Sequence, residues 1–131
     1  MFPYLYAHEK LSTSVRILAI GEGDIRSRLQ GAFNEFHTLQ SKDIPPELQK
    51  DYAWIIKELT KREPKYQFDT IDNPFDENQM NYLEWKKDGS LLYNLRRMKN
   101  RTGSRIAKKV CDLQDSIQLA YEEYRLELRK S

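Results

Sequence analysis

Residues 102–131 decide the fold, and they read TGSRIAKKVCDLQDSIQLAYEEYRLELRKS. The apolar residues of this stretch recur at steps of four and three, which places them on one stripe of an α-helix. The positions between them are mostly charged, so the helix is expected to be amphipathic along its whole length. Such a stripe must be covered by other parts of the chain. It consists of Ile106, Val110, Leu113, Ile117, Ala120 and Tyr124.

Three more helices are predicted in the first half of the chain, over residues 4–20, 24–39 and 46–61. We expect Gly21 to end the first helix in the left-handed conformation that glycine tolerates. Asp24 is expected to cap the second helix, because its carboxylate can accept from the free N–H groups of the first turn. Pro45-Pro46 marks the start of the third. The short connection from Gly21 to Asp24 makes the first two helices antiparallel neighbours.

Residues 62–89 lack a regular apolar pattern, and a connection of this length needs local order of its own. Asp88-Gly89 lies between two aromatic stretches, as in a β-hairpin. The alternative is a short helix over 78–86 followed by a helix that begins after Ser90, which the helical spacing of Leu91, Leu95 and Met98 favours. In either case we expect Phe68, Phe75 and Trp85 to pack onto the bundle.

The junction at Gly103 leaves two alternatives for the last helix. A glycine inside a continuous helix costs about 1 kcal/mol relative to alanine. The helix can instead be interrupted or kinked over residues 100–104, with Thr102 as the N-cap of a new segment.

Length and composition favour one domain, residues 1–131, in the all-α class. The predicted architecture is a single antiparallel helical bundle of four or five helices, with a long irregular insertion before the last two. Because Cys111 is the only cysteine, it cannot form an internal disulfide, and a reducing compartment is expected. We find neither a signal peptide nor a membrane span and expect a cytoplasmic protein.

Catalytic signatures are lacking. GxSxG, HExxH, CxxC and the P-loop motif do not occur, and His8 and His37, the only two histidines, fall on different predicted helices. We therefore expect no catalytic residues, no metal site and no cofactor, and the chain is not predicted to be an enzyme.

A cluster of basic residues precedes and enters the last helix. Residues 86–109 contain nine Lys or Arg and one Asp, whereas residues 63–84 contain six acids and one Lys. Arg97, Arg101, Arg105 and Lys108 are spaced so that a continuous helix presents them along one edge. A helix that starts near Thr102 would add free N–H groups suited to an anion. The candidate anion-binding residues are Arg96, Arg97, Lys99, Arg101, Thr102, Ser104, Arg105, Lys108 and Lys109.

These patterns lead to two functional hypotheses. The first is a small helical binding protein that contacts nucleic acid, or another phosphate-bearing or acidic partner, through this basic edge. Aromatic residues near the cluster, Tyr82, Trp85 and Tyr93, either stack on bases or anchor a loop. The alternative is a protein-interaction or self-associating module, with a homodimer formed through the C-terminal helix. The basic residues would then only solvate a surface or pair with the acidic segment.

Overall fold

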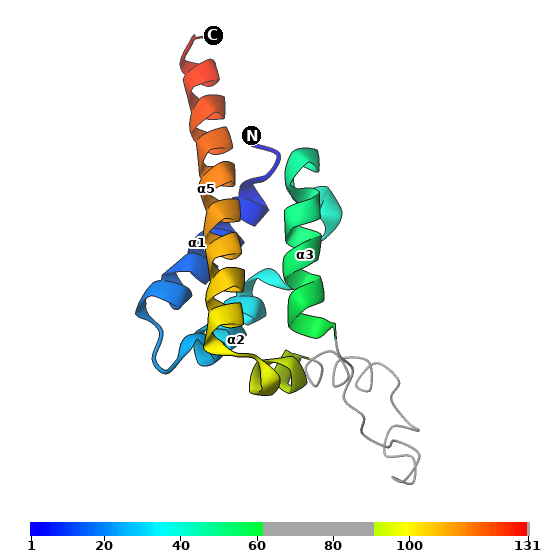
Figure 1. The fold of residues 1–131 in the computed structure, drawn as a ribbon. Coiled ribbons are helices and arrows are strands. Elements are labelled where there is room, and N and C mark those ends of the chain that lie inside the picture. Colours follow the sequence, from blue (N-terminus) through cyan, green and yellow to red (C-terminus); the bar gives the residue numbers. More distant parts are fainter. Residues whose placement is uncertain (62–90, 131) are drawn as a thin grey trace, which may run out of the picture.

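The computed structural model describes residues 1–61 and 91–130, and within these ranges every regular element is a helix (Figure 1). The predicted all-α bundle is confirmed. The predictions for residues 62–89, including the hairpin, the short helix and the packing of Phe68, Phe75 and Trp85, lie outside the described residues. Residues 91–97 are helical. The other elements are α1 (Leu5–Ile20), α2 (Ile25–Phe36), the short 3₁₀ helices η1 (Ser41–Asp43) and η2 (Pro46–Leu48), α3 (Gln49–Thr60) and α5 (Asn100–Lys130).

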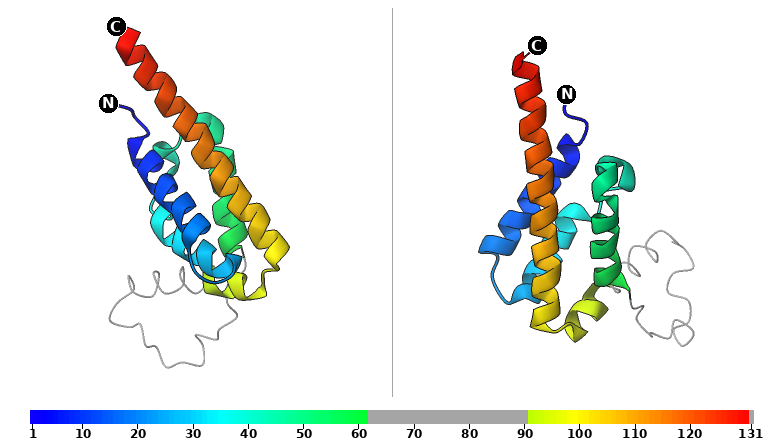
Figure 2. Two further views of the ribbon diagram at one scale, coloured as in Figure 1. Left: turned by 90° about the vertical axis from the view of Figure 1, so that its left-hand side faces the viewer. Right: turned by 45° about the horizontal axis from the view of Figure 1, so that its top comes forward.

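α5 is the central element of the bundle. It contacts α1, α2 and α3, and its C-terminal end extends beyond the other helices (Figures 1 and 2). The stripe residues Ile106, Val110, Leu113 and Ile117 are buried, as the spacing predicted. The core they join is formed mainly by Leu11 and Leu18 of α1, Leu29, Phe33 and Phe36 of α2, and Ile55 and Leu59 of α3.

The N-terminus of α2 is capped by Asp24 as predicted, but the turn that precedes it has a different backbone conformation from the one expected. The Asp24 carboxylate accepts hydrogen bonds from the backbone N–H groups of Arg26 and Ser27 at 3.0 and 3.2 Å. Gly21 was predicted to be left-handed, but it is extended, with φ −63° and ψ 153°; the positive φ, 88°, is at Gly23. Gly21 is needed for another reason, because a Cβ there would lie 2.5 Å from the Ile17 carbonyl oxygen.

The N-terminal segment covers the upper part of the α5 stripe. Phe2 is buried, and its ring centroid lies 5.3 Å from that of Tyr121 and 5.5 Å from that of Tyr124. The sequence pattern did not identify this contact, since Phe2 precedes the helix. It leaves Tyr124 partly buried within the monomer.

α2 ends at Phe36, three residues before the predicted end. The Tyr52 hydroxyl of α3 lies 3.0 and 2.9 Å from the carbonyl oxygens of Phe36 and Leu39 and shares its one proton between these two acceptors at the end of α2. Burial of this phenol raises its pKa, which keeps the hydroxyl protonated as a donor. The third helix also differs from its predicted start at Pro46, because residues 46–48 form a 3₁₀ turn ahead of α3.

The buried stripe predicts a sharp difference between two positions on α5. Ile117→Ala is expected to lower the free energy of unfolding by about 2–4 kcal/mol, because it removes buried methylene groups and leaves a cavity. Leu119→Ala, at a side chain that is 61% exposed, should change it by less than about 0.5 kcal/mol. Denaturant unfolding followed by circular dichroism measures both, and equal losses would contradict the packing described.

Candidate functional site

The helical structure is interrupted at Met98 and Lys99, just before α5, and not at Gly103. α5 begins at Asn100, and the Lys99 carbonyl oxygen accepts from the Gly103 N–H at 3.0 Å. Of the two alternatives for the last helix, the continuous one is found: Thr102 caps no new segment, and Thr102 and Ser104 lie inside the first turns of α5. A glycine is retained inside this helix because the packing of α5 against α2 requires a residue of its small size.

Gly103 is buried where α5 meets α2. A Cβ at this position would lie 2.9 Å from Ile25 Cγ2 and 3.5 Å from Leu29 Cδ1. The missing side chain thus allows α2 to approach α5 closely. This close contact with α2 accounts for the glycine inside the helix.

The predicted four-residue basic edge is divided by the same break. Arg97 lies on the helix that precedes α5, where its guanidinium stacks 3.7 Å from the ring centroid of Tyr93. Arg101, Arg105 and Lys108 follow one another on α5 at steps of four and three, and all three are exposed. The edge that remains is formed by α5 alone.

The other candidate residues are distributed over separate grooves. Arg96 faces the start of α2 in a groove of about 420 Å³ that includes Asp24 and Arg26. A second groove, of about 310 Å³, contains Arg97, Lys99 and Thr102 beside the end of α3. A third, of about 590 Å³, lies between α3 and α5 and is lined by Lys50, Asp51, Trp54, Arg105, Lys108, Lys109 and Asp112. We call this last one the α3–α5 groove.

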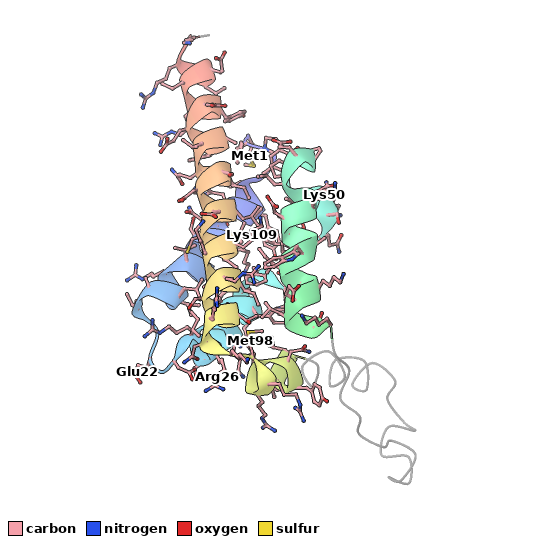
Figure 3. All side chains as sticks on the ribbon, viewed as in Figure 1. Met1, Glu22, Arg26, Lys50, Met98 and Lys109 are labelled. Atoms are coloured by element: carbon pink, nitrogen blue, oxygen red, sulfur yellow. The ribbon has the colours of Figure 1, made fainter. Side chains whose placement is uncertain are left out.

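The α3–α5 groove combines four cations, two carboxylates and an indole. Lys109 lies on the side of α5 that faces α3, and Lys50 is near the start of α3 (Figure 3). The Lys109 ammonium pairs with Asp51 at 3.2 Å and also lies over the Trp54 ring, 5.9 Å from its centroid. The described residues that line the groove therefore carry a net positive charge, with an aromatic ring at the border.

Carboxylates already hold two of these cations. Lys108 donates to Asp112 at 2.9 Å one turn along α5, which raises the pKa of its ammonium group. Exposed pairs of this kind contribute little to stability, because water and salt screen them. No ion pair involves Arg105 among the described residues. A polyanion can therefore engage Arg105 directly and compete for the two lysines.

Lys50 and Trp54 are the groove residues that the sequence analysis missed. Trp54 lies off the apolar line of its helix, and Lys50 precedes it by one turn. That pairing of an aromatic side chain with a lysine at i−4 was visible in the sequence. Its proximity to Lys109, more than fifty residues later, depends on the packing of α3 against α5.

Both histidines have structural contacts. His8 Nε2 and Gln118 Oε1, 2.5 Å apart, join α1 to α5, and the His37 ring bonds carbonyl oxygens of its own helix. Burial raises the pKa of the Cys111 thiol, which opposes thiolate formation. Within residues 1–61 and 91–130, no three His, Cys, Asp or Glu side chains gather as a metal site.

Comparison of the chain with protein families, with curated proteins and with solved structures found no match. The helices in the described part of the chain are too short or too polar to cross a bilayer. Any functional conclusion must therefore come from the geometry of the groove itself.

The contact at Gly103 yields a test by paired substitution. Gly103→Ala is expected to lower the free energy of unfolding by about 1 kcal/mol, because overpacking costs of about 1–3 kcal/mol exceed the gain in helix propensity of about 1 kcal/mol. In an Ile25→Ala background the same change should raise it by about 1 kcal/mol, since the obstructing methyl group is gone. Denaturant unfolding of the four proteins in this cycle measures the coupling; identical effects in both backgrounds would refute the contact.

Proposed function

We propose that the protein binds the phosphate backbone of nucleic acid at the α3–α5 groove and along the adjoining edge of α5. The observation that carries this proposal is the convergence of Arg105, Lys108 and Lys109 from α5 with Lys50 from α3 on one groove. Contacts between such cations and phosphates release counterions and so provide affinity with little regard to sequence. The proposal includes the cytoplasmic location expected from the single cysteine.

A polyanion fits the groove better than a single small anion. Lys108 and Lys109 are already paired with Asp112 and Asp51, so one phosphate would have to displace a carboxylate for each lysine it gained. A nucleic-acid strand presents many phosphates in a row and can contact unpaired and paired cations together. The release of several counterions at once then offsets the loss of the intramolecular pairs.

The dimensions of the α5 edge support the same partner. Arg101 and Lys108 are seven helical steps apart, with Arg105 between them, which corresponds to a length of roughly 10 Å at a rise of about 1.5 Å per residue. One strand of B-form DNA carries a phosphate about every 3.4 Å along its axis, so the edge covers the length of roughly three phosphates. Because these side chains form a line rather than a set aimed at base edges, binding is expected to depend only weakly on sequence.

Salt dependence provides the direct test. Arg101→Ala and Arg105→Ala are each expected to weaken oligonucleotide binding and to reduce the slope of log K against log salt by about one unit. Arg16→Ala removes the same charge from an exposed position on α1 and should leave the slope unchanged. Fluorescence anisotropy with labelled oligonucleotides at several salt concentrations measures these slopes. An equal effect of all three substitutions would show a net-charge response and no site.

A second substitution removes a negative charge from the groove instead of a positive one. Asp51→Asn frees Lys109 from its ion pair and is expected to increase affinity by up to about fivefold, the equivalent of about 1 kcal/mol. Glu22→Gln alters net charge equally, but at the α1–α2 turn, away from α3 (Figure 3). If both substitutions raise affinity alike, or Asp51→Asn lowers it, the groove is not the binding site.

Self-association through the end of α5 is the second candidate function, and a second copy of the chain is the partner it requires. The support is the exposure of Leu126, 52%, on the part of α5 that extends beyond the bundle (Figure 2). An antiparallel copy centred on Leu126 would place Glu122 and Glu123 opposite Lys130 and Arg129. This version of the homodimer hypothesis relies on the outer face of the helix, since the stripe from Ile106 to Ile117 is already buried within one chain.

The self-association hypothesis predicts a concentration-dependent dimer in analytical ultracentrifugation. Leu126→Glu should abolish it, because a carboxylate at the centre of the interface would be desolvated beside its own copy. Leu126→Ala should weaken it less. Purely monomeric behaviour of the wild-type chain up to high micromolar concentration would contradict this candidate.

A further inference from the structure

We propose that the α3–α5 groove accepts a single strand in preference to a duplex, with one nucleobase stacked on the Trp54 indole. This inference rests on the proposed function and specifies the form of its ligand. Two features of the groove carry it: the position of Trp54 among cations from both helices, and the lysine that lies over its ring.

Trp54 presents an aromatic surface to the groove. Its side chain is partly buried, so one part of the indole packs against the core while another borders the groove with Lys50 and Lys109. The Lys109 ammonium lies over the ring, 5.9 Å from the centroid. A cation in this position identifies a face of the indole that a planar group can also approach.

A base and the Lys109 ammonium would compete for that face. Stacking of a base on an aromatic ring is generally stronger than an exposed cation–π contact, so an incoming base displaces the ammonium. Lys109 has a flexible stem of four carbons, which allows its ammonium to move toward the neighbouring phosphate. The phosphate would then compete with Asp51, now 3.2 Å from the ammonium. Stacking and phosphate binding therefore support each other at this site.

A duplex meets only half of these requirements. Its phosphates can contact Arg105 and Lys108, but its bases are paired and stacked on one another, and their faces are inaccessible. The Trp54 side chain is partly buried in the groove between α3 and α5, which limits its ability to insert between stacked base pairs. Single strands combine free base faces with a flexible backbone, and aromatic rings beside cations are the usual means of binding them.

The test uses the intrinsic fluorescence of Trp54. The chain has two tryptophans, so Trp85→Phe leaves Trp54 as the only one, and excitation at the red edge of the indole band avoids the tyrosines. We expect a single-stranded oligothymidine to quench or shift this emission on binding, and a duplex of equal length to bind with little change. The measurement requires no substitution in the groove, so it stays decisive even if Trp54 variants fold poorly.

Affinities of Trp54→Leu, measured by anisotropy of labelled strands, provide the second readout. We expect about tenfold weaker binding of the single strand, the loss of one stacked base, and an unchanged affinity for the duplex. Trp54→Phe should retain part of the affinity because it keeps a ring. If Trp54 emission does not respond, or if both ligands lose affinity equally, base stacking is wrong while phosphate binding stands. If neither the single strand nor the duplex binds, the proposed function is overturned and this inference with it.

Discussion

The burial of one apolar stripe on α5 is the constraint on which the rest of the structure depends. The buried stripe, from Ile106 to Ile117, lies on the helix that contacts α1, α2 and α3, and these three helices cover it together. Phe2 continues the cover at Tyr121 and Tyr124. Burial on this scale provides most of the driving force for folding, because removal of apolar surface from water is the dominant favourable term.

The same constraint determines where the charges of α5 lie. Once the stripe faces the core, the residues on the opposite side of the helix must face solvent, which places Arg101, Arg105 and Lys108 along an exposed edge. Lys109 falls between the two sides and meets Asp51 and Trp54 of α3. The α3–α5 groove is thus a consequence of core packing, and its cations come together without any dedicated loop.

Local patterns in the sequence were sufficient to predict the stripe and the described helices apart from some of their ends, since both depend on spacing along a single helix. The Asp24 cap was equally local. Helix ends and the role of Gly103 were harder to predict: α2 ends three residues early, and Gly103 makes room for Ile25, a contact that no local pattern reveals. For the candidate site, spacing was sufficient to predict the edge on α5. Arg97 does not belong to that edge, because the helix is interrupted at Met98 and Lys99. Trp54 and Lys50 required knowledge of how α3 packs against α5.

Mapping of the bound surface by ¹H–¹⁵N correlation spectroscopy tests the central claim most directly. An unlabelled single-stranded oligonucleotide is added to the ¹⁵N-labelled protein at low salt, and amide shifts are followed residue by residue. The account predicts that the largest changes fall on residues 50–54 and 101–109, together with the Trp54 indole N–H, and disappear at high salt. Changes concentrated at the α1–α2 turn, or no changes at any residue, would contradict it.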